Sequence, residues 1–456
     1  MHAQSASERA AEAAKKYAGE EITITWEAGL QALDPKNFSI PKWEERTGVK
    51  VRVVELPVGE MFTKTMQEYR AGTGAYDVLN VVPAWMPDLA QAGALEPLGP
   101  FIDKYDYRAD LEGIAPVYRN NWMTYQDKVY AIPDDGDQWM LFYRKDLFND
   151  AENQRQFEQE YGYALEPPKT WDQFDDIARF FTDKYGPELH GAAMFGKPPY
   201  AQRTFQERFR VAGGRFFDPE TMKATINTET GVEVLERMRA QVDYMPDGVQ
   251  QWGFGELLSA FLKGNVAMVQ SWPPFGRWAA GYGTDSEPLS WVPATQIAGK
   301  VGYAVPPGGA SQMAVGFSLS VASNSDQKEL AYLFIQWINS QEISLQRVQL
   351  PYALRDPFRE SHYTDSEYKS RWDSAPEYLQ TLKDSAAVGL LDLSIVQTAA
   401  YQEALQRGIS RLWAGDDPQK ILDDVAAEWN EITERVGVER QRKVYQDWAS
   451  KPNAYP

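Results

Sequence analysis

The stretch 128-KVYAIPDDGDQWMLFYRKDLF-148 places three aspartates, Asp134, Asp135 and Asp137, between a short apolar run and an aromatic one. A proline and a glycine interrupt any regular periodicity there, so the aspartates lie on an irregular segment. Carboxylates in such a segment can hold a metal ion, form a catalytic pair, or accept hydrogen bonds from a ligand in a cleft. The rest of the chain is needed to choose among these three uses.

Length and charge exclude several classes of protein. A chain of 456 residues is too long for one compact core, so two lobes are expected. The net charge of −19 would repel a phosphate-rich partner, which argues against binding of nucleic acid. No apolar run approaches the ~18 residues that a membrane helix requires.

The residue types present also limit the chemistry. Cysteine is absent, which removes disulfides, thiol nucleophiles and thiolate-bound zinc. The three histidines, His2, His190 and His362, are scattered without metal-ligand spacing. Aromatic residues make up 13% of the chain. Most are expected in the core, but flat rings with a polar edge also stack on the C–H faces of sugars.

The first part of the chain has an alternating strand and helix pattern. Strands are predicted at 21–27, 49–56 and 77–82, with helices at 38–48 and 59–72 between them. Short connections make the strands parallel, with right-handed crossovers. Such sheets bind ligands outside the carboxyl ends of their strands, which here carry Trp26-Glu27, Leu56-Pro57 and Pro83-Ala84-Trp85.

A second α/β region follows the aspartates. A helix over 168–186 has five core-facing residues and Thr170 as its N-cap. Further elements are expected as a helix over 227–243, strands over 265–272 and 313–323, a helix over 326–340 with a core-facing stripe, and a late helix that begins at Asp417-Pro418.

Four stretches, in this order and spacing, resemble a known family. They are the opening strand pattern, 128–148 with 168-PKTWDQF-174, 261-FLKGNVAMVQSW-272, and 316-GFSLSVASNSDQKELAYLFIQWI-338. The family is that of extracellular solute-binding proteins of carbohydrate ABC importers, of the maltose-binding-protein type. The resemblance covers most of the chain from Glu20 to about residue 432. It implies the α/β, two-lobed periplasmic-binding-protein type II fold, with a ligand cleft between the lobes and a hinge of several crossings.

The resemblance also implies a division of the chain. We expect an N-terminal leader at 1–19, a first lobe at 20–133 and a second at 137–313, a return to the first lobe at 316–352, and C-terminal helices of the second lobe at 356–456. The crossings are then expected near Pro133–Asp137, Ala314–Gly316 and Ala353–Asp356. The stretch 149–170 looks like an extended connector whose effect on the cleft stays open.

The N-terminal residues bear on localisation. His2-Ala3-Gln4 resembles the end of a signal cleavage region, which predicts a mature, exported, periplasmic protein. The alternative is a polar leader on a cytoplasmic protein.

The resemblance proposes ligand contacts near the strand ends. Asp137 matches a position where the family often places a sugar-binding carboxylate, with a solvated or capping aspartate as the alternative. Asp135 is a second candidate. Trp85 and Trp272 end strands where the family places stacking aromatics, with a core role as the alternative.

Other candidates carry clear alternatives. Trp26 and Glu27 end the first strand, although Trp26 could continue the buried face. Further candidates by position are Arg203, Gly316 at the second crossing, Arg355 at the third, and Tyr401, which the family would lay over the ligand. Arg355 could instead form an ion pair with Asp356.

Reversible capture of a sugar or polyol, with delivery to an ABC transporter permease, is the function that this pattern predicts. We expect a monomer without catalysis, cofactor or metal; the register of the aspartates does not fit a calcium loop. One alternative is a glycoside hydrolase that uses Asp134, Asp135 and Asp137 as its acids. Others are a binding protein for a non-sugar solute such as a polyamine, or a scaffold that recruits proteins through its acidic surface.

Overall fold

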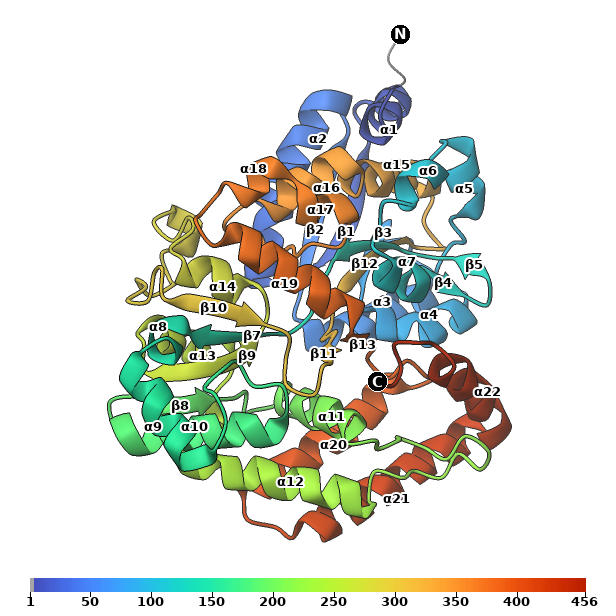
Figure 1. Cartoon of the computed structure of the whole chain (residues 1–456). Helices are drawn as coiled ribbons and strands as arrows, with labels where there is room; N and C mark the ends of the chain where they lie inside the picture. The colour runs from blue at the N-terminus through green and yellow to red at the C-terminus, as the bar shows by residue number, and fades with distance from the viewer. Residues whose placement is uncertain (1–3) are drawn as a thin grey trace. The chain divides into compact units, whose positions relative to one another are not determined.

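The structure, a computed structural model, describes residues 4–456. His2 and Ala3 lie outside the described residues, so the cleavage-site interpretation stays a prediction. Within the described range, no helix is both long enough and apolar enough to cross a membrane. The chain divides into two compact units. Unit 1 comprises the described residues up to Asp137 and Val315–Tyr368, and unit 2 comprises Gln138–Ala314 and Lys369–Pro456. Figure 1 labels their helices and strands.

Unit 1 is built on a five-stranded sheet of order β2-β1-β3-β12-β6. Strand β1 (Glu21–Glu27) pairs in parallel with β2 (Lys50–Leu56) and β3 (Val78–Val81), as the sequence predicted. Strand β12 (Phe317–Val321) lies between β3 and β6 (Ile132–Asp135) and is antiparallel to both. The carboxyl ends of β1, β3 and β6 therefore share one edge with the start of β12.

Helices surround this sheet in unit 1. The helices of the first two crossovers, α2 and α3, each end at a glycine in the left-handed conformation, Gly48 and Gly72 respectively. A short hairpin is formed by β4 and β5. The bounds are α2 Ile40–Thr47, α3 Val58–Ala71, α4 Met86–Ala92, α5 Gly99–Lys104, α6 Arg108–Leu111, α7 Pro116–Trp122, β4 Thr124–Tyr125, β5 Lys128–Val129, α15 Lys328–Ile338, α16 Gln341–Val348 and α17 Glu360–Thr364.

The described part of the predicted N-terminal leader, from Gln4 onward, belongs to unit 1. Helix α1 (Ala6–Ala14) begins with a capping box between Ser5 and Glu8. Its small residues Ala10 and Ala14 are fully buried, and the helix packs against α15. Gln336 also donates a hydrogen bond to the Ala6 carbonyl at 3.2 Å. The alanines make a flat face that fits closely on α15, which a polar leader would not do.

Unit 2 contains a four-stranded sheet of order β10-β7-β9-β8. Strand β7 (Met140–Arg144) is antiparallel to β9 (Val266–Ser271) and β10 (Val301–Ala304), and β8 (His190–Ala193) is parallel to β9. Strands β8, β9 and β10 therefore end at the edge where β7 begins.

Helix starts in unit 2 agree with the sequence prediction. Thr170 and Gln173 form a capping box at α10, and the Asp417 side chain accepts a hydrogen bond from the Lys420 N–H at 2.9 Å at α21. Half of the stretch 149–170 is helix α9. The bounds are α8 Lys145–Phe148, α9 Ala151–Tyr161, α10 Trp171–Tyr185, α11 Ala201–Val211, α12 Glu229–Gln241, α13 Phe254–Leu262, α14 Pro274–Ala279, α19 Ala375–Ala387, α20 Thr398–Trp413, α21 Pro418–Val436 and α22 Val438–Ala449.

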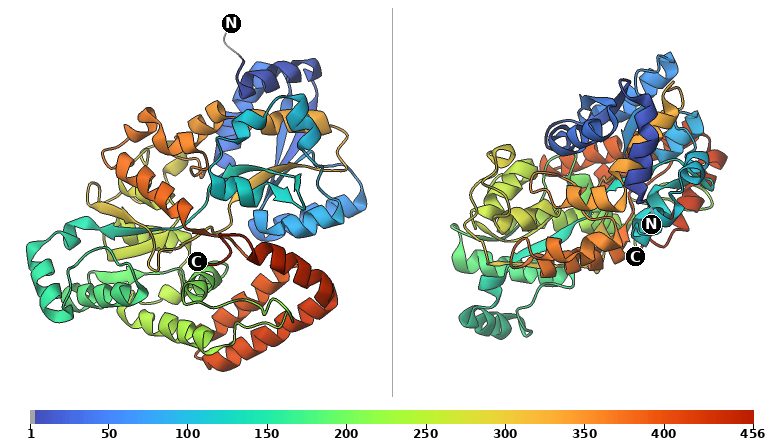
Figure 2. Two further views of the ribbon diagram at one scale, coloured as in Figure 1. Left: turned by 45° about the vertical axis from the view of Figure 1, so that its right-hand side comes forward. Right: turned by 90° about the horizontal axis from the view of Figure 1, so that it is seen from above.

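The C-terminal helices of unit 2 form one packed group. Helix α21 packs against both α20 and α22, in the red part of the colour ramp in Figure 2. Nearby, β11 (Ser311–Gln312) pairs in parallel with β13 (Gly389–Leu390).

The boundaries between the units fall after Asp137, after Ala314 and after Tyr368. The first two fall within the ranges expected for crossings, but the third lies beyond the expected Ala353–Asp356. The reason is that the intervening residues bond to unit 1. Ala115 donates to the Phe358 carbonyl at 2.9 Å, and Arg359 forms an ion pair with Asp110 at 2.7 Å. Helix α18 (Ser366–Lys369) spans this last boundary.

Gly191 in β8 should not tolerate a side chain, because α10 lies directly against it. An added Cβ would lie 1.9 Å from the Ala178 carbonyl oxygen. We expect Gly191→Ala to lower the free energy of unfolding by about 2 kcal/mol or more, measured by urea unfolding. Gly255→Ala in α13 is the control: nothing lies within 4 Å of its Cβ position. Alanine there should be neutral or stabilising, by up to ~1 kcal/mol. Equal unfolding midpoints for both variants would contradict the close approach.

Candidate functional site

A buried network of charges occupies the interior of unit 1. Arg347 on α16 binds Asp34 and Asp134, each at 2.6 Å. Arg355 binds Asp134 at 3.2 Å and Asp135 at 2.9 Å. The side chains of all five residues are at most 1% exposed. Asp134 and Asp135 are therefore structural partners of arginines, and their geometry favours this role over that of ligand acceptors.

Arg355 was expected either to reach a ligand or to pair with Asp356. Its ion pairs are instead with Asp134 and Asp135, and its guanidinium lies 4.9 Å from the centre of the Trp26 ring. Trp26 is fully buried, and its indole N–H donates to the Gln31 carbonyl at 3.0 Å. The alternative of a buried face therefore fits Trp26 better than a stacking role.

Asp137 differs from its two neighbours in sequence. It is 7% exposed, and one carboxylate oxygen accepts a hydrogen bond from the Gly316 N–H at 3.2 Å. Among residues 4–456 no hydrogen bond to its other oxygen is formed. Burial, reinforced by Asp135 and Asp356, raises the pKa of Asp137 well above its ordinary value. Asp137 thus combines a fixed orientation with an oxygen that remains open.

Gly316 is required by the backbone that holds Asp137. Its φ is 63°, and an added Cβ would lie 2.1 Å from the Trp122 ring. Only glycine satisfies both constraints without strain. Its contribution to the site is therefore its backbone N–H.

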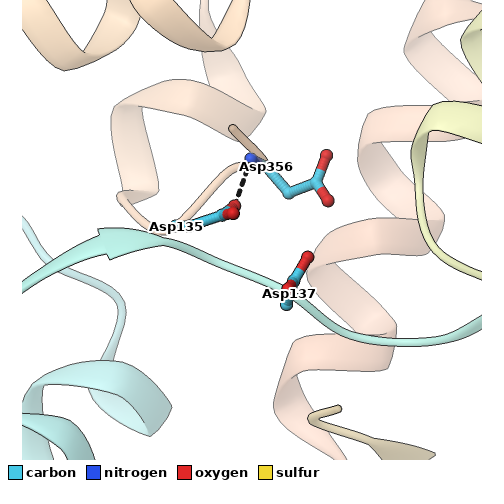
Figure 3. Close-up of side chains that lie close together, drawn as sticks. All are labelled: Asp135, Asp137 and Asp356. Carbon is cyan, nitrogen blue, oxygen red and sulfur yellow. Dashed lines mark hydrogen bonds between the residues drawn. The ribbon is translucent and has the colours of Figure 1, made fainter. Parts of the chain in front are cut away.

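Asp135, Asp137 and Asp356 form a group of buried carboxylates (Figure 3). One oxygen from each lies within 4.8 Å of the others. Asp135, however, already binds Arg355 and accepts the Asp356 N–H at 2.7 Å. Calcium needs six to eight oxygen ligands, so this group alone would not complete a calcium shell. This group is therefore not assigned as a metal site.

Glu27 follows the same edge of the sheet at the end of β1. It is half-buried, and no hydrogen bond to its carboxylate is formed within the described part of the chain. Burial raises the pKa of Glu27 to about 7, with Asp135 adding to the rise and Arg355 opposing it. Glu27 can therefore gain or lose a proton near neutral pH.

Trp85 completes the candidate set of unit 1. It lies in a short 3₁₀ turn, Pro83–Trp85, after the carboxyl end of β3. The ring is half-buried and packs against Phe62 at 5.7 Å between centres. Because β1, β3 and β6 end at one edge, the sheet brings Glu27, Trp85 and Asp137 to that edge together with the Gly316 N–H.

Aromatic residues gather at the edge of the unit 2 sheet where β8, β9 and β10 end and β7 begins. Trp272 follows β9, is 8% exposed, and donates its indole N–H to the Ala314 carbonyl at 3.1 Å. Around its ring lie Trp139 at 5.6 Å, Phe195 at 5.2 Å and Tyr200 at 5.8 Å. The sequence predicted Trp272 but not Phe195 or Tyr200, which follow β8 without a distinctive pattern.

Arg203 lies in the first turn of α11, half-buried. Its guanidinium is 3.7 Å from the Asp392 carboxylate, which accepts a hydrogen bond from Gln312 at 2.6 Å. Sequence reasoning missed Asp392 and also Glu207 and Gln270, which lie close to this group. Only Gln270 carried a signal, since it lies near the end of β9, two positions before Trp272.

Tyr401 lies away from the group around Trp272. It is fully buried among the C-terminal helices, between Phe217 at 5.6 Å and Trp429 at 5.6 Å. Its hydroxyl bonds with Thr433 at 2.8 Å and accepts from Gln441 at 2.9 Å. The expectation that Tyr401 covers a ligand is therefore replaced by a core role, because its ring and hydroxyl are both fully engaged.

The geometry can be compared with known proteins. A profile of the family described as bacterial extracellular solute-binding protein matches residues 12–343. The chain belongs to this family. This confirms the resemblance drawn from the sequence, and it is a family of transport solute-binding proteins rather than of enzymes.

Individual relatives agree with the family. A probable ABC transporter-binding protein of Deinococcus radiodurans is 26% identical over 73% of this chain and 75% of its own length. A solute-binding protein of Agrobacterium radiobacter K84 in complex with ribitol has a TM-score of 0.73 at 22% identity, over 91% of this chain and 99% of that one. Maltose-bound MalE3 of T. maritima has a TM-score of 0.72 at 22% identity, over 91% and 100%. These structures establish the two-lobed fold.

Removing one member of the buried charge network should be costly. Arg347→Met would leave Asp34 without its bonded cation, and we expect the free energy of unfolding to fall by about 3–5 kcal/mol. Arg407→Met is the control, because its ion pair with Glu428 is exposed. That change should cost at most ~1 kcal/mol. Denaturant unfolding monitored by circular dichroism measures both, and similar small losses would contradict a structural role for the network.

Proposed function

We propose that the protein captures a sugar or polyol in the periplasm and delivers it to the permease of an ABC importer. The observation that carries this proposal is the edge of the unit 1 sheet. There Asp137 keeps an unbonded carboxylate oxygen, while Gly316 holds its other oxygen at 3.2 Å. An acceptor with a fixed direction suits a ligand hydroxyl. Such a hydrogen bond contributes roughly 0.5–1.5 kcal/mol, or roughly 1.5–3 kcal/mol where the carboxyl group is ionised.

The aromatic residues supply the complementary part of the proposal. Trp85 in unit 1 and Trp272 in unit 2 each present a large ring near the end of a sheet strand, and such rings stack on the C–H faces of sugars. A few stacking contacts and hydrogen bonds reach about −8 kcal/mol, which is micromolar affinity. The ribitol and maltose in the complexes of similar fold support the class of ligand.

Capture is proposed to proceed by closure of the two units on the ligand. A ligand that contacts both units binds the closed form more tightly, and this difference in affinity shifts the population toward it. In this proposal the protein is a monomer and catalyses no reaction. The ion pairs of Asp134 with Arg347 and of Asp135 with Arg355 argue against a glycoside hydrolase.

A cationic solute such as a polyamine is the second candidate. The observation that favours it is the group of acids around Asp137, namely Glu27, Asp135 and Asp356, which raise its pKa together with burial. A bound ammonium group would stabilise the ionised carboxylates. The same binding assay separates the two candidates, with putrescine and spermidine beside the sugars.

Titration calorimetry with erythritol, ribitol, D-mannitol and maltose tests the proposed ligand class. For the sugar that binds, Trp85→Ala and Trp272→Ala should each weaken binding by about 1 kcal/mol, as expected for a lost stacking contact. Asp137→Asn should also weaken binding, because it replaces one acceptor oxygen with an NH₂ group and keeps the shape. Trp291→Ala is the control, since that ring is 39% exposed and packs on Trp278. Wild-type affinity in all three variants would refute this placement of the site.

Small-angle scattering tests the closure. The radius of gyration should be smaller with the sugar that binds than without it, because the units rotate about the crossing segments. Gly316→Ala, which disturbs one crossing, should reduce this difference. Tight binding with an unchanged radius of gyration would favour a preformed pocket in one unit.

A further inference from the structure

Glu207 is a buried acid outside the set of proposed ligand contacts. It lies on α11 and is fully buried. Both of its carboxylate oxygens accept hydrogen bonds from the Gln270 amide nitrogen, at 2.8 and 2.7 Å. The Gln312 N–H donates a further hydrogen bond to one of these oxygens at 3.3 Å. Burial raises the pKa of Glu207 to about 7. No ion pair to Glu207 is formed within residues 4–456.

The neighbouring arginines do not neutralise this acid directly. The Arg208 guanidinium lies 4.0 Å from the centre of the Trp171 ring. Arg210 donates to the Gln312 side chain at 2.5 Å and to the carbonyls of Leu391 and Ala454. Three hydrogen bonds reach this carboxylate, but within residues 4–456 no cation pairs with it. A buried carboxylate without a paired cation costs stability. Its presence at this position therefore calls for a use other than stability.

The carboxylate determines the orientation of the Gln270 amide. An ionised carboxylate only accepts hydrogen bonds, so Gln270 must turn its NH₂ group toward Glu207. The hydrogen bonds to Glu207 therefore assign the nitrogen and oxygen of the Gln270 amide, which atom positions alone often do not distinguish. The Gln270 carbonyl oxygen then points away from Glu207. The residue is 9% exposed, and within the described chain no hydrogen bond to this oxygen is formed.

Gln270 adjoins the candidate residues of unit 2 both in sequence and through its bond to Glu207. Gln270 is the last but one residue of β9, and Trp272 follows the end of this strand directly. Arg203 precedes Glu207 by four positions, one turn earlier on the same side of α11. The Glu207 carboxylate also accepts from the Gln312 N–H, and the Gln312 side chain donates to Asp392, the ion-pair partner of Arg203. Gln270 thus belongs to one bonded group with Arg203.

We propose that Glu207 is a positioning residue that fixes the Gln270 carbonyl oxygen as an acceptor for a ligand hydroxyl in unit 2. The inference rests on the proposed function, because it assigns a specificity element to the same sugar or polyol. Unit 2 then selects ligands that donate a hydrogen bond next to the Trp272 ring. Glu207 does not touch the ligand and acts only through Gln270.

Glu207→Gln is the informative variant, because a glutamine can both donate and accept and no longer imposes one orientation on Gln270. At pH 8, where the wild-type carboxyl is ionised, we expect about five- to tenfold weaker binding of the sugar that the wild type binds, among erythritol, ribitol, D-mannitol and maltose. The melting temperature should stay equal or rise, because a buried charge is removed. Glu403→Gln, the same change at an exposed position on α20, should leave both unchanged.

The double variant Glu207→Gln/Gln270→Met tests whether Glu207 acts through Gln270. It contains no unpaired buried charge, and it should bind as weakly as Gln270→Met alone, provided that this single variant folds. If Gln270→Met does not fold, the double variant should still bind no better than Glu207→Gln.

The outcomes separate the inference from the proposed function. If the wild type binds a sugar and Glu207→Gln binds it equally well, the inference is overturned and the proposed function stands. Weaker binding with a lower melting temperature would make Glu207 a structural residue and also overturn the inference. If the wild type binds none of the sugars, the proposed function fails and the inference fails with it.

Discussion

Two buried arginines, Arg347 and Arg355, determine which residues surround them in the interior of unit 1. Each must be surrounded by carboxylates, since an unpaired charge in that position would cost several kcal/mol. The carboxylates come from Asp34, after β1, and from Asp134 and Asp135 on β6. This requirement brings the chain after α16 back to the edge of the sheet. There the Gly136 N–H and the Asp356 carbonyl bond at 3.1 Å and complete the connection.

The placement of Asp137 follows from this arrangement. Residues on both sides of Gly136 are held, so the carboxylate two positions beyond Asp135 has little freedom. Gly316 then fixes one of its oxygens. A fixed acceptor loses less conformational entropy on binding than a mobile one. The buried ion pairs thus contribute to recognition without touching a ligand.

Local sequence patterns predicted the regular elements well. Alternation gave β1 and β2, and the capping residues Thr170 and Asp417 marked helix starts correctly. These features depend on neighbours in sequence, which a single chain displays. The family resemblance placed Asp137, Trp85 and Trp272 near strand ends for the same reason. Their contact with a ligand stays a prediction.

The expectations that the structure does not favour depended on distant residues. Nothing near Asp135 in sequence reveals that Arg355 neutralises it, and nothing near Tyr401 reveals that Thr433 and Gln441 take up its hydroxyl. The orientation of Gln270 is likewise set by Glu207 on another element. The extension of unit 1 to Tyr368 follows from backbone and ion-pair contacts with residues near 110–115. Such pairings become visible only when the chain is folded.

The position of β12 between β3 and β6 has a consequence for the order in which the chain folds. During synthesis, β3 and β6 appear long before Phe317–Val321, the strand that joins them. The sheet of unit 1 therefore stays incomplete while all of Gln138–Ala314 is made. Loop closure over such a distance slows folding. The unpaired edges of β3 and β6 are meanwhile exposed, and such edges favour pairing with other chains.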